Sequence, residues 1–245
     1  MDVRPFLATM VEKKASDLFI TAMFPPSAKI DGELRPLTEA KLTPAQSLEF
    51  VETLMTDAQK KEFRESRECN FAYAVSGLGR FRVSAFWQRD SAGCVMRRIE
   101  TTIPEVDDLK LPPILKDLVM SKRGLIIMVG GTGTGKSTSL AALIGYRNQH
   151  ARGHILTIED PVEFVHNHRQ SIVTQREVGI DTESFDAALK SSLRQAPDVI
   201  LIGEIRTQET MEFALSFAET GHLCMATLHA NNANQALDRI MHLVP

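Results

Sequence analysis

The sequence contains few cysteines and no long apolar run. Its three cysteines, Cys69, Cys94 and Cys224, are too widely spaced among 245 residues for a disulfide framework or a zinc site. No apolar run approaches the ~20 residues that span a bilayer, and the first residues lack the apolar core of a signal peptide. We therefore expect a protein of a reducing compartment, the cytoplasm, without a membrane-spanning segment.

Aromatic residues and net charge are also low. Aromatic side chains make up 6% of the residues, too few for a surface on which single-stranded nucleic acid stacks. The formal net charge is −3, whereas a dedicated nucleic-acid binder is usually basic. Hydrophobic residues account for 43% and charged residues for 24%, the proportions of a globular protein with a sizeable core. The composition therefore argues against nucleic acid as a partner.

The first hundred residues have the pattern of a small α+β domain. Asp31-Gly32 lies between two alternating segments, which predicts a β-hairpin. Two helices are expected to begin after Thr43 and Thr56, because a glutamine three residues later completes a capping box at each. Three strands should follow, over residues 68–75, 80–89 and 94–99. These elements together predict one domain over residues 1–100.

A second domain is expected after a proline-rich segment. Residues 101–113 are acidic and contain three prolines, which is typical of a linker. Short apolar runs then predict strands over residues 125–129, 155–158, 199–202 and 223–228. Helical patterns separate these runs, over residues 137–149, 184–195 and 207–219. Strands without polar alternation are covered on both faces, and their alternation with helices predicts a parallel α/β sheet within residues 114–245.

A glycine-rich motif follows the first of these strands. Residues 130–138 read GGTGTGKST and match the phosphate-binding pattern G-x-x-x-x-G-K-[ST] between a strand and a helix. The glycines let backbone N–H groups surround phosphate oxygens, and the start of the helix adds its dipole. We expect Lys136 to reach the β- and γ-phosphates and the Ser137 hydroxyl to ligate Mg²⁺. The predicted contacts of ATP are Gly130, Thr132, Gly133, Thr134, Gly135, Lys136, Ser137 and Thr138.

Acidic residues follow two other strands of the same sheet. The strand ending at residue 158 continues into Glu159, Asp160 and Glu163, and the strand ending at residue 202 continues into Gly203 and Glu204. Parallel strands bind ligands beyond their carboxyl ends, so these acids are expected beside the phosphates. Gly203 occupies the position of the Mg²⁺-ligating aspartate of many P-loop ATPases. We therefore expect Glu204 to act through water, and Glu163 to polarise the attacking water.

Two histidines flank the last predicted strand. His222 and His229 lie ~20 Å apart if residues 223–228 are extended, and their odd spacing places them on opposite faces. Metal ligation by both histidines is therefore not expected, and Cys224 between them is interpreted as a buried thiol. His229 emerges beside the predicted phosphates, where it would sense the γ-phosphate, orient the acids or serve as a core histidine. His222 follows a helix end marked by Gly221, which favours a structural or inter-subunit role.

Four segments in the second domain resemble the secretion ATPases. GGTGTGKST, IEDPVE, LIGEIR and the segment 219–240 are similar to the Walker A motif, Asp box, Walker B motif and His box of that superfamily. SDLFI, GLGRFRVSAF and VTQREVG extend the similarity over essentially the whole chain. Within the superfamily the chain resembles the type IV pilus retraction ATPases, PilT and PilU. TLHANNANQALDRI and GEIRTQET favour the PilU branch.

The resemblance implies a RecA-like P-loop core with a parallel sheet, preceded by a smaller PAS-like α+β domain, in a homohexameric ring. ATP hydrolysis with Mg²⁺ would power pilus retraction, and so twitching motility, at the cytoplasmic face of the inner membrane. Expected partners are further copies of the chain, a PilT-like retraction ATPase and the inner-membrane platform protein of the pilus. Assembly ATPases usually carry another N-terminal domain and often a four-cysteine metal motif, so their absence favours retraction.

The resemblance also bears on the end of the sequence and on the arginines of the first domain. The family continues into a helical region after the segment 231–243, so we expect a fragment that retains ATP binding. Most of the five arginines within residues 80–98 fit solvated strand faces or salt bridges. The resemblance places γ-phosphate contacts on these strands, and we assign them to Arg82 and Arg97.

Two other functions stay open at this point. The chain would be an accessory ATP-binding subunit if it acted through a PilT-like partner motor. It would be a RecA-like nucleic-acid translocase if it formed a basic channel, which the composition does not indicate. Glu163 and Glu204 favour an active ATPase over the accessory role.

Overall fold

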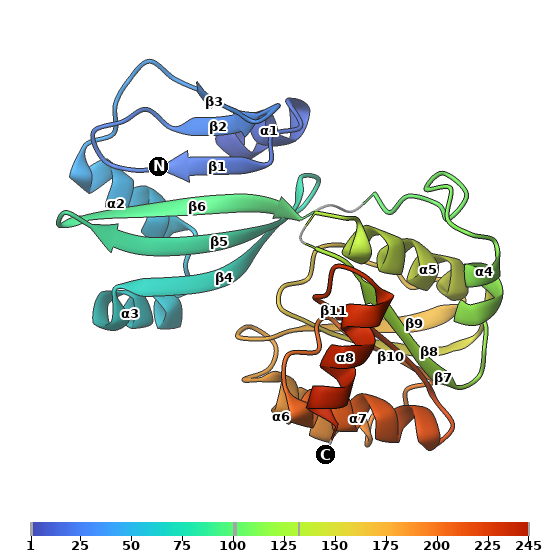
Figure 1. Ribbon diagram of the computed structural model, residues 1–245. Helices are drawn as coiled ribbons and strands as arrows, with labels where there is room; N and C mark the ends of the chain where they lie inside the picture. Colours follow the sequence, from blue (N-terminus) through green and yellow to red (C-terminus); the bar gives the residue numbers. More distant parts are fainter. Residues whose placement is uncertain (1, 100–101, 132, 245) are drawn as a thin grey trace. The chain divides into compact units, whose positions relative to one another are not determined.

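The computed structural model describes residues 2–99, 102–131 and 133–244. The chain divides into two compact units, residues 1–99 and 100–245, each with its own buried core (Figure 1). The division lies next to the boundary expected at residue 100. Within the described ranges, no helix combines the length and the apolar character needed to cross a membrane.

The first unit is an antiparallel sheet with helices packed on it. Its strands lie in the order β3-β2-β1-β6-β5-β4. Their bounds are β1 Asp17–Ile20, β2 Ser27–Ile30, β3 Glu33–Pro36, β4 Glu68–Val75, β5 Gly79–Gln88 and β6 Ser91–Ile99. The helices are α1 Arg4–Glu12, α2 Pro44–Thr53 and α3 Asp57–Ser66. Helix α2 contacts β6 and α3 contacts β4, which buries Phe50 and Phe63 in a core shared with Phe81 and Val83 of β5.

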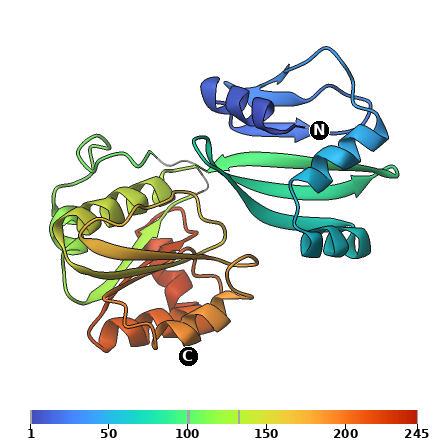
Figure 2. The ribbon, with the colours of Figure 1, turned by 180° about the vertical axis from the view of Figure 1, so that it is seen from behind.

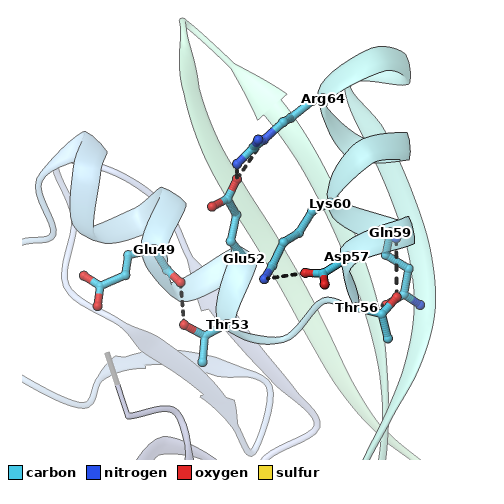
Figure 3. Close-up of polar contacts among 8 residues, drawn as sticks. All are labelled: Glu49, Glu52, Thr53, Thr56, Asp57, Gln59, Lys60 and Arg64. Carbon is cyan, nitrogen blue, oxygen red and sulfur yellow. Dashed lines mark hydrogen bonds and ion pairs between the residues drawn. The ribbon is translucent and has the colours of Figure 1, made fainter.

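Local signals of the first unit act as predicted. Asp31 and Gly32 join β2 to β3 with φ angles of 52° and 82°, both in the left-handed region that such a hairpin turn requires. The capping box at the start of α2 is also confirmed. At the start of α3, the Thr56 hydroxyl accepts from the Gln59 N–H while the Gln59 side chain accepts from the Thr56 N–H (Figure 3).

An ion pair joins the two capped helices, α2 and α3. Arg64 of α3 donates two hydrogen bonds to one carboxylate oxygen of Glu52 on α2, at 2.7 and 3.1 Å (Figure 3). The Glu52 side chain is 23% exposed and that of Arg64 is 65% exposed, so this is a surface ion pair of modest stabilising effect. This ion pair joins the two helices on the same side of the first unit.

The second unit is a five-stranded parallel sheet in the order β7-β11-β10-β8-β9. Its strands are β7 Gly124–Val129, β8 Gly153–Glu159, β9 Ser171–Glu177, β10 Val199–Ile202 and β11 Leu223–Leu228. Its helices are α4 Ile114–Val119, α5 Lys136–His150, α6 Phe185–Ser192, α7 Gln208–Glu219 and α8 Ala233–Leu243. The four predicted strands and the helices between them are confirmed. Strand β9 and helix α4 were not predicted.

Helices cover both faces of this sheet. In Figures 1 and 2, α4 and α5 lie on one side of the strands, and α6 and α7 lie on the other. Leu201 of β10 accordingly belongs to one buried cluster and Ile202, one residue later, to the other. The segment predicted as a linker belongs to this unit from residue 102 on, because Val106 is buried in the cluster beneath α5. Its first residue, Thr101, lies outside the described residues.

Candidate functional site

A cavity of about 440 Å³ opens in the second unit, at the carboxyl ends of β8, β10 and β11 and beside the loop after β7. Its walls come from segments far apart in the sequence. The start of α5 contributes Lys136 and Ser137. The end of β8 contributes Glu159, and the segment after it contributes Glu163. Because the strands are parallel, their carboxyl ends bring these segments together at one edge of the sheet. Ligands bind at this edge in such sheets.

The glycine-rich loop shows the geometry of a phosphate-binding loop. Gly135 has a φ of 89°, in the left-handed region, and it caps the start of α5. A Cβ on Gly130 would lie 2.5 Å from the Thr134 hydroxyl, so this position has no room for a side chain. The Lys136 ammonium donates to the carbonyls of Gly130 and Gly131 at 2.9 and 2.8 Å. The lysine is therefore held over its own loop, with its charge next to the cavity.

Most of the predicted nucleotide contacts meet at this place. Five of them line the cavity: Gly133, Gly135, Lys136, Ser137 and Thr138. Gly130 lines an adjoining depression that it shares with His229. The hydroxyl of Thr134 donates to the Gly131 carbonyl inside the loop. Thr132 lies outside the described residues.

Glu204 and His229 are in direct contact at the cavity. The Nε2 atom of His229 lies 3.0 Å from one Glu204 oxygen, and the Arg206 guanidinium donates to the other at 2.7 Å. The Glu204 side chain is 16% exposed, so both partners hold a shielded carboxylate. Arg206 also lies 3.6 Å from Asp160, which links the end of β10 to the end of β8. The structure thus brings His229 beside an acid, the arrangement in which it would orient that acid.

The absence of a side chain at Gly203 has a steric cause. The Gly203 N–H donates to the Ile158 carbonyl, which draws the end of β10 onto the end of β8. A Cβ at this position would lie 3.0 Å from the Cα of Glu159 and 3.1 Å from the Ile158 oxygen. An aspartate at this position, which other P-loop ATPases carry, would press on the backbone at the end of β8. Coordination of Mg²⁺ without a residue at this position stays a prediction.

Replacing Gly203 with alanine is expected to lower the free energy of unfolding by about 1–3 kcal/mol, because the added methyl presses on β8 backbone. Chemical denaturation measures this difference. Gly145→Ala, within helix α5, is the matched control. The added Cβ would lie 3.7 Å from the Ile103 side chain, an ordinary van der Waals contact. Alanine favours a helix over glycine, so the control should be unchanged or more stable. Equal stability of Gly203→Ala and the parent would contradict the steric explanation.

Two acids, one at the end of β8 and one in the segment after it, have different environments. Glu163 is exposed and lines the cavity. The Glu159 carboxylate accepts from the Thr157 hydroxyl at 2.6 Å and from the Gln175 amide at 3.2 Å. Burial raises the pKa of Glu159, and the charge of Glu163 adds to this, whereas the hydrogen bonds oppose it. Both acids line the cavity, but Glu159 is fixed by hydrogen bonds whereas Glu163 is exposed.

Several groups that line the cavity were given no role from the sequence, among them Glu159, His166 and Arg206. Glu159 was noticed as a strand-end acid but given no role, and its position after an apolar strand was the signal available. His166 is buried, and its burial lowers the pKa of the imidazole to about 4, so the ring is neutral near pH 7. A lone histidine in a loop carries no sequence signal that distinguishes it from a surface residue.

Arg82 and Arg97 lie side by side in the first unit. They are direct partners in the register between β5 and β6. The Arg97 guanidinium donates to Asp17 at 2.8 Å, although its side chain remains 64% exposed. An ion pair, the alternative expected for most of these arginines, is thus present for Arg97. The contact of both residues with a nucleotide stays a prediction.

The two histidines around β11 are separate, as expected. His222 precedes the strand, and its ring lies 4.5 Å from the ring of Phe217 at the end of α7. Cys224 is buried, and burial raises the pKa of its thiol to about 12, so it is a neutral core residue. Among the residues that the structure describes, no group of three or more histidine, cysteine or acidic side chains could hold a metal ion.

The chain matches the Type II/IV secretion system protein family over residues 2–245. It belongs to this family. The predicted resemblance to the secretion ATPases is therefore confirmed. The type IV pilus ATPase PilU of Pseudomonas aeruginosa is 61% identical over the whole chain, and the chain spans 64% of the length of that relative. The retraction ATPase PilT of the same organism is 42% identical, and the chain spans 71% of it.

Solved structures of the family have the same fold. A crystal structure of the pilus retraction motor PilT with bound ADP superposes with a TM-score of 0.94 at 42% identity, over 100% of this chain and 72% of that one. The ATPase DotB of Legionella pneumophila superposes with a TM-score of 0.83 at 25% identity, over 99% of this chain and 68% of that one. The predicted α/β fold with a RecA-like core is confirmed.

Proposed function

We propose that the chain is the ATP-hydrolysing part of a type IV pilus retraction motor of the PilU kind. The observation that carries this proposal is one cavity shared by Lys136 and Ser137 of the phosphate-binding loop with Glu163, Glu204 and His229. The similarity to PilU and PilT supplies the motor and the pilus, because both relatives are named as pilus ATPases. Twitching motility would follow from retraction.

The loop before α5 fits the phosphates of ATP. Lys136 exchanges its two loop carbonyls for the β- and γ-phosphates when ATP enters, so its charge is in place before binding. The backbone amides of the loop and the start of α5 add donors for the same oxygens. Ser137 would ligate the Mg²⁺ that accompanies ATP, which supplies positive charge to the phosphates. A nucleotide-bound PilT of the same fold supports this assignment.

The acids divide the remaining chemistry. Glu163 is exposed toward the cavity and acts as the base that polarises the attacking water. Glu204 is bound to His229 and Arg206, so it orients water and the histidine rather than taking up a proton. His229, which follows the end of β11, would then sense the γ-phosphate by contact with it.

The first unit would serve as the family's PAS-like domain and supply charge to the same reaction. In this proposal Arg82 and Arg97 contact the γ-phosphate of ATP. They lose this contact once the phosphate has left, which frees the first unit to move. The motor would be a homohexameric ring at the cytoplasmic face of the inner membrane. It would act on the pilus platform protein together with a PilT-like ATPase. The family resemblance is the support for these assembly features.

Phosphate release from ATP by the purified chain, alone and mixed with a PilT-like ATPase, tests this function. We expect hydrolysis that depends on Mg²⁺ and does not change when DNA is added. Hydrolysis that appears only in the mixture would instead support an accessory subunit. Stimulation by DNA would favour a nucleic-acid translocase and contradict the pilus assignment.

A further inference from the structure

The sequence VTQREVG, residues 173–179, begins on strand β9 and ends just after it, and the proposed function does not use it. This strand lies at the edge of the parallel sheet and pairs with β8. Gln175 and Glu177 lie two residues apart on it, so they share one side of the strand. Both side chains reach the segment 160–166, which follows β8 and carries Glu163.

Gln175 binds this segment through both ends of its amide. Its Nε2 donates to the Phe164 carbonyl at 2.8 Å and to the Glu159 carboxylate at 3.2 Å. Its Oε1 accepts from the His166 N–H at 2.7 Å. An uncharged amide offers two N–H donors and a carbonyl acceptor in one group, and Gln175 uses both kinds here. The glutamine side chain therefore matches the backbone groups of the segment that it holds.

Glu177 binds the same segment at Val162, nearer in sequence to the end of β8 than the residues that Gln175 binds. Its side chain is buried, and its carboxylate accepts from the Val162 N–H at 3.1 Å. The next residue, Val178, donates its N–H to the Glu159 carbonyl. Charge-assisted bonds of this kind are stronger than bonds between neutral groups. Glu177 therefore fixes the start of the segment, while Gln175 fixes its middle and its end.

The bonds from β9 reach every second residue of the segment. Val162, Phe164 and His166 are bound through their backbone, and Glu163 lies between the first two. Side-chain groups of β9 thus replace the backbone partners that a neighbouring strand would provide. Glu163 is left exposed at the cavity, on a backbone fixed from both sides. A general base requires such a fixed position, because small displacements reduce the rate strongly.

We propose that Gln175 and Glu177 are positioning residues that hold Glu163 against the nucleotide. The proposal rests on the proposed function for the role of Glu163. They act on the reaction through the backbone of residues 162–166.

Gln175→Leu tests the proposal, because leucine keeps the volume but removes the donor and the acceptor. Amide hydrogen exchange of the 245-residue chain should rise in residues 160–166 and stay unchanged in β10. The kcat for ATP should fall about 10- to 100-fold, while KM stays within about two-fold. Gln175→Glu provides a second variant if the leucine disturbs folding, since it keeps the acceptor and loses both donors. Ile172→Thr, on an exposed position of the same strand, is the control.

A double substitution separates positioning from general stability. In a Glu163→Gln background, Gln175→Leu should cause no further loss of hydrolysis, because the group that it positions is already absent. A further loss of the same size would overturn the proposal, as would unchanged exchange in residues 160–166. Parent-like hydrolysis by Glu163→Gln alone would contradict the proposed base. The exchange measurement would still decide whether β9 holds the segment.

Discussion

Replacing Lys136 with alanine should abolish ATP hydrolysis and weaken ATP binding. The ammonium is the positive charge that the glycine-rich loop holds next to the cavity, at hydrogen-bond distance from the Gly130 and Gly131 carbonyls. Loss of one such preorganised charge lowers turnover by about 10²- to 10³-fold. Titration with a fluorescent ATP analogue and phosphate release measure the two effects.

The control for this prediction is another lysine of the same unit. Lys122 is exposed before β7, and its replacement by alanine removes the same charge at the opposite end of that strand from the glycine-rich loop. Lys122→Ala should bind and hydrolyse ATP as the parent does. Parent-like binding by Lys136→Ala would show that the cavity is not the nucleotide site, and the proposed function would fail with it.

The phosphate-binding loop was predictable because its requirements are local. An apolar strand, a loop that needs glycine and a helix that begins at Lys136 follow one another within a short stretch. The capping boxes and the Asp31-Gly32 hairpin are of the same kind, since each depends on residues within three or four positions. Local physics therefore fixed the elements and one wall of the site.

The opposite wall was only partly predictable, because it depends on contacts between distant segments. Strand β9, which pairs with β8, was not predicted. Three consecutive polar residues, Thr174, Gln175 and Arg176, interrupt the apolar pattern that identified the other strands of this sheet. The polar residues are required by the partners that they meet: Gln175 by the segment 160–166 and Arg176 by Ser191 of α6. Such partners cannot be identified from periodicity, because sequence separation does not reveal them.

The charges around Glu204 show a second limit of sequence reasoning. The sequence placed Glu204 and His229 at the same edge of the sheet, and the structure pairs them at 3.0 Å. It did not indicate Arg206, which binds Glu204 and approaches Asp160. This arginine partly neutralises two of the acids at the cavity. Glu163, which faces the cavity outside this network, is consequently the better candidate for the base.

Replacing Glu163 with glutamine should remove hydrolysis and preserve ATP binding. The amide keeps the size of the side chain and its hydrogen-bonding ability, but it cannot polarise water as a carboxylate does. General bases contribute about 10²- to 10⁴-fold to turnover, which sets the expected loss of kcat. Phosphate release in single-turnover and steady-state experiments measures it, and titration with an ATP analogue shows whether binding persists.

Glu183→Gln and Glu204→Gln complete this test. Glu183 is exposed in the segment before α6, so its substitution should leave hydrolysis unchanged. Glu204→Gln should also reduce turnover, because the amide lacks the negative charge of the carboxylate. That charge attracts Arg206, and it attracts His229 when the imidazole is protonated. If Glu204→Gln lost hydrolysis while Glu163→Gln kept it, the base would be Glu204. The hydrogen bonds from β9 to residues 162–166 would then hold a segment without a catalytic carboxylate.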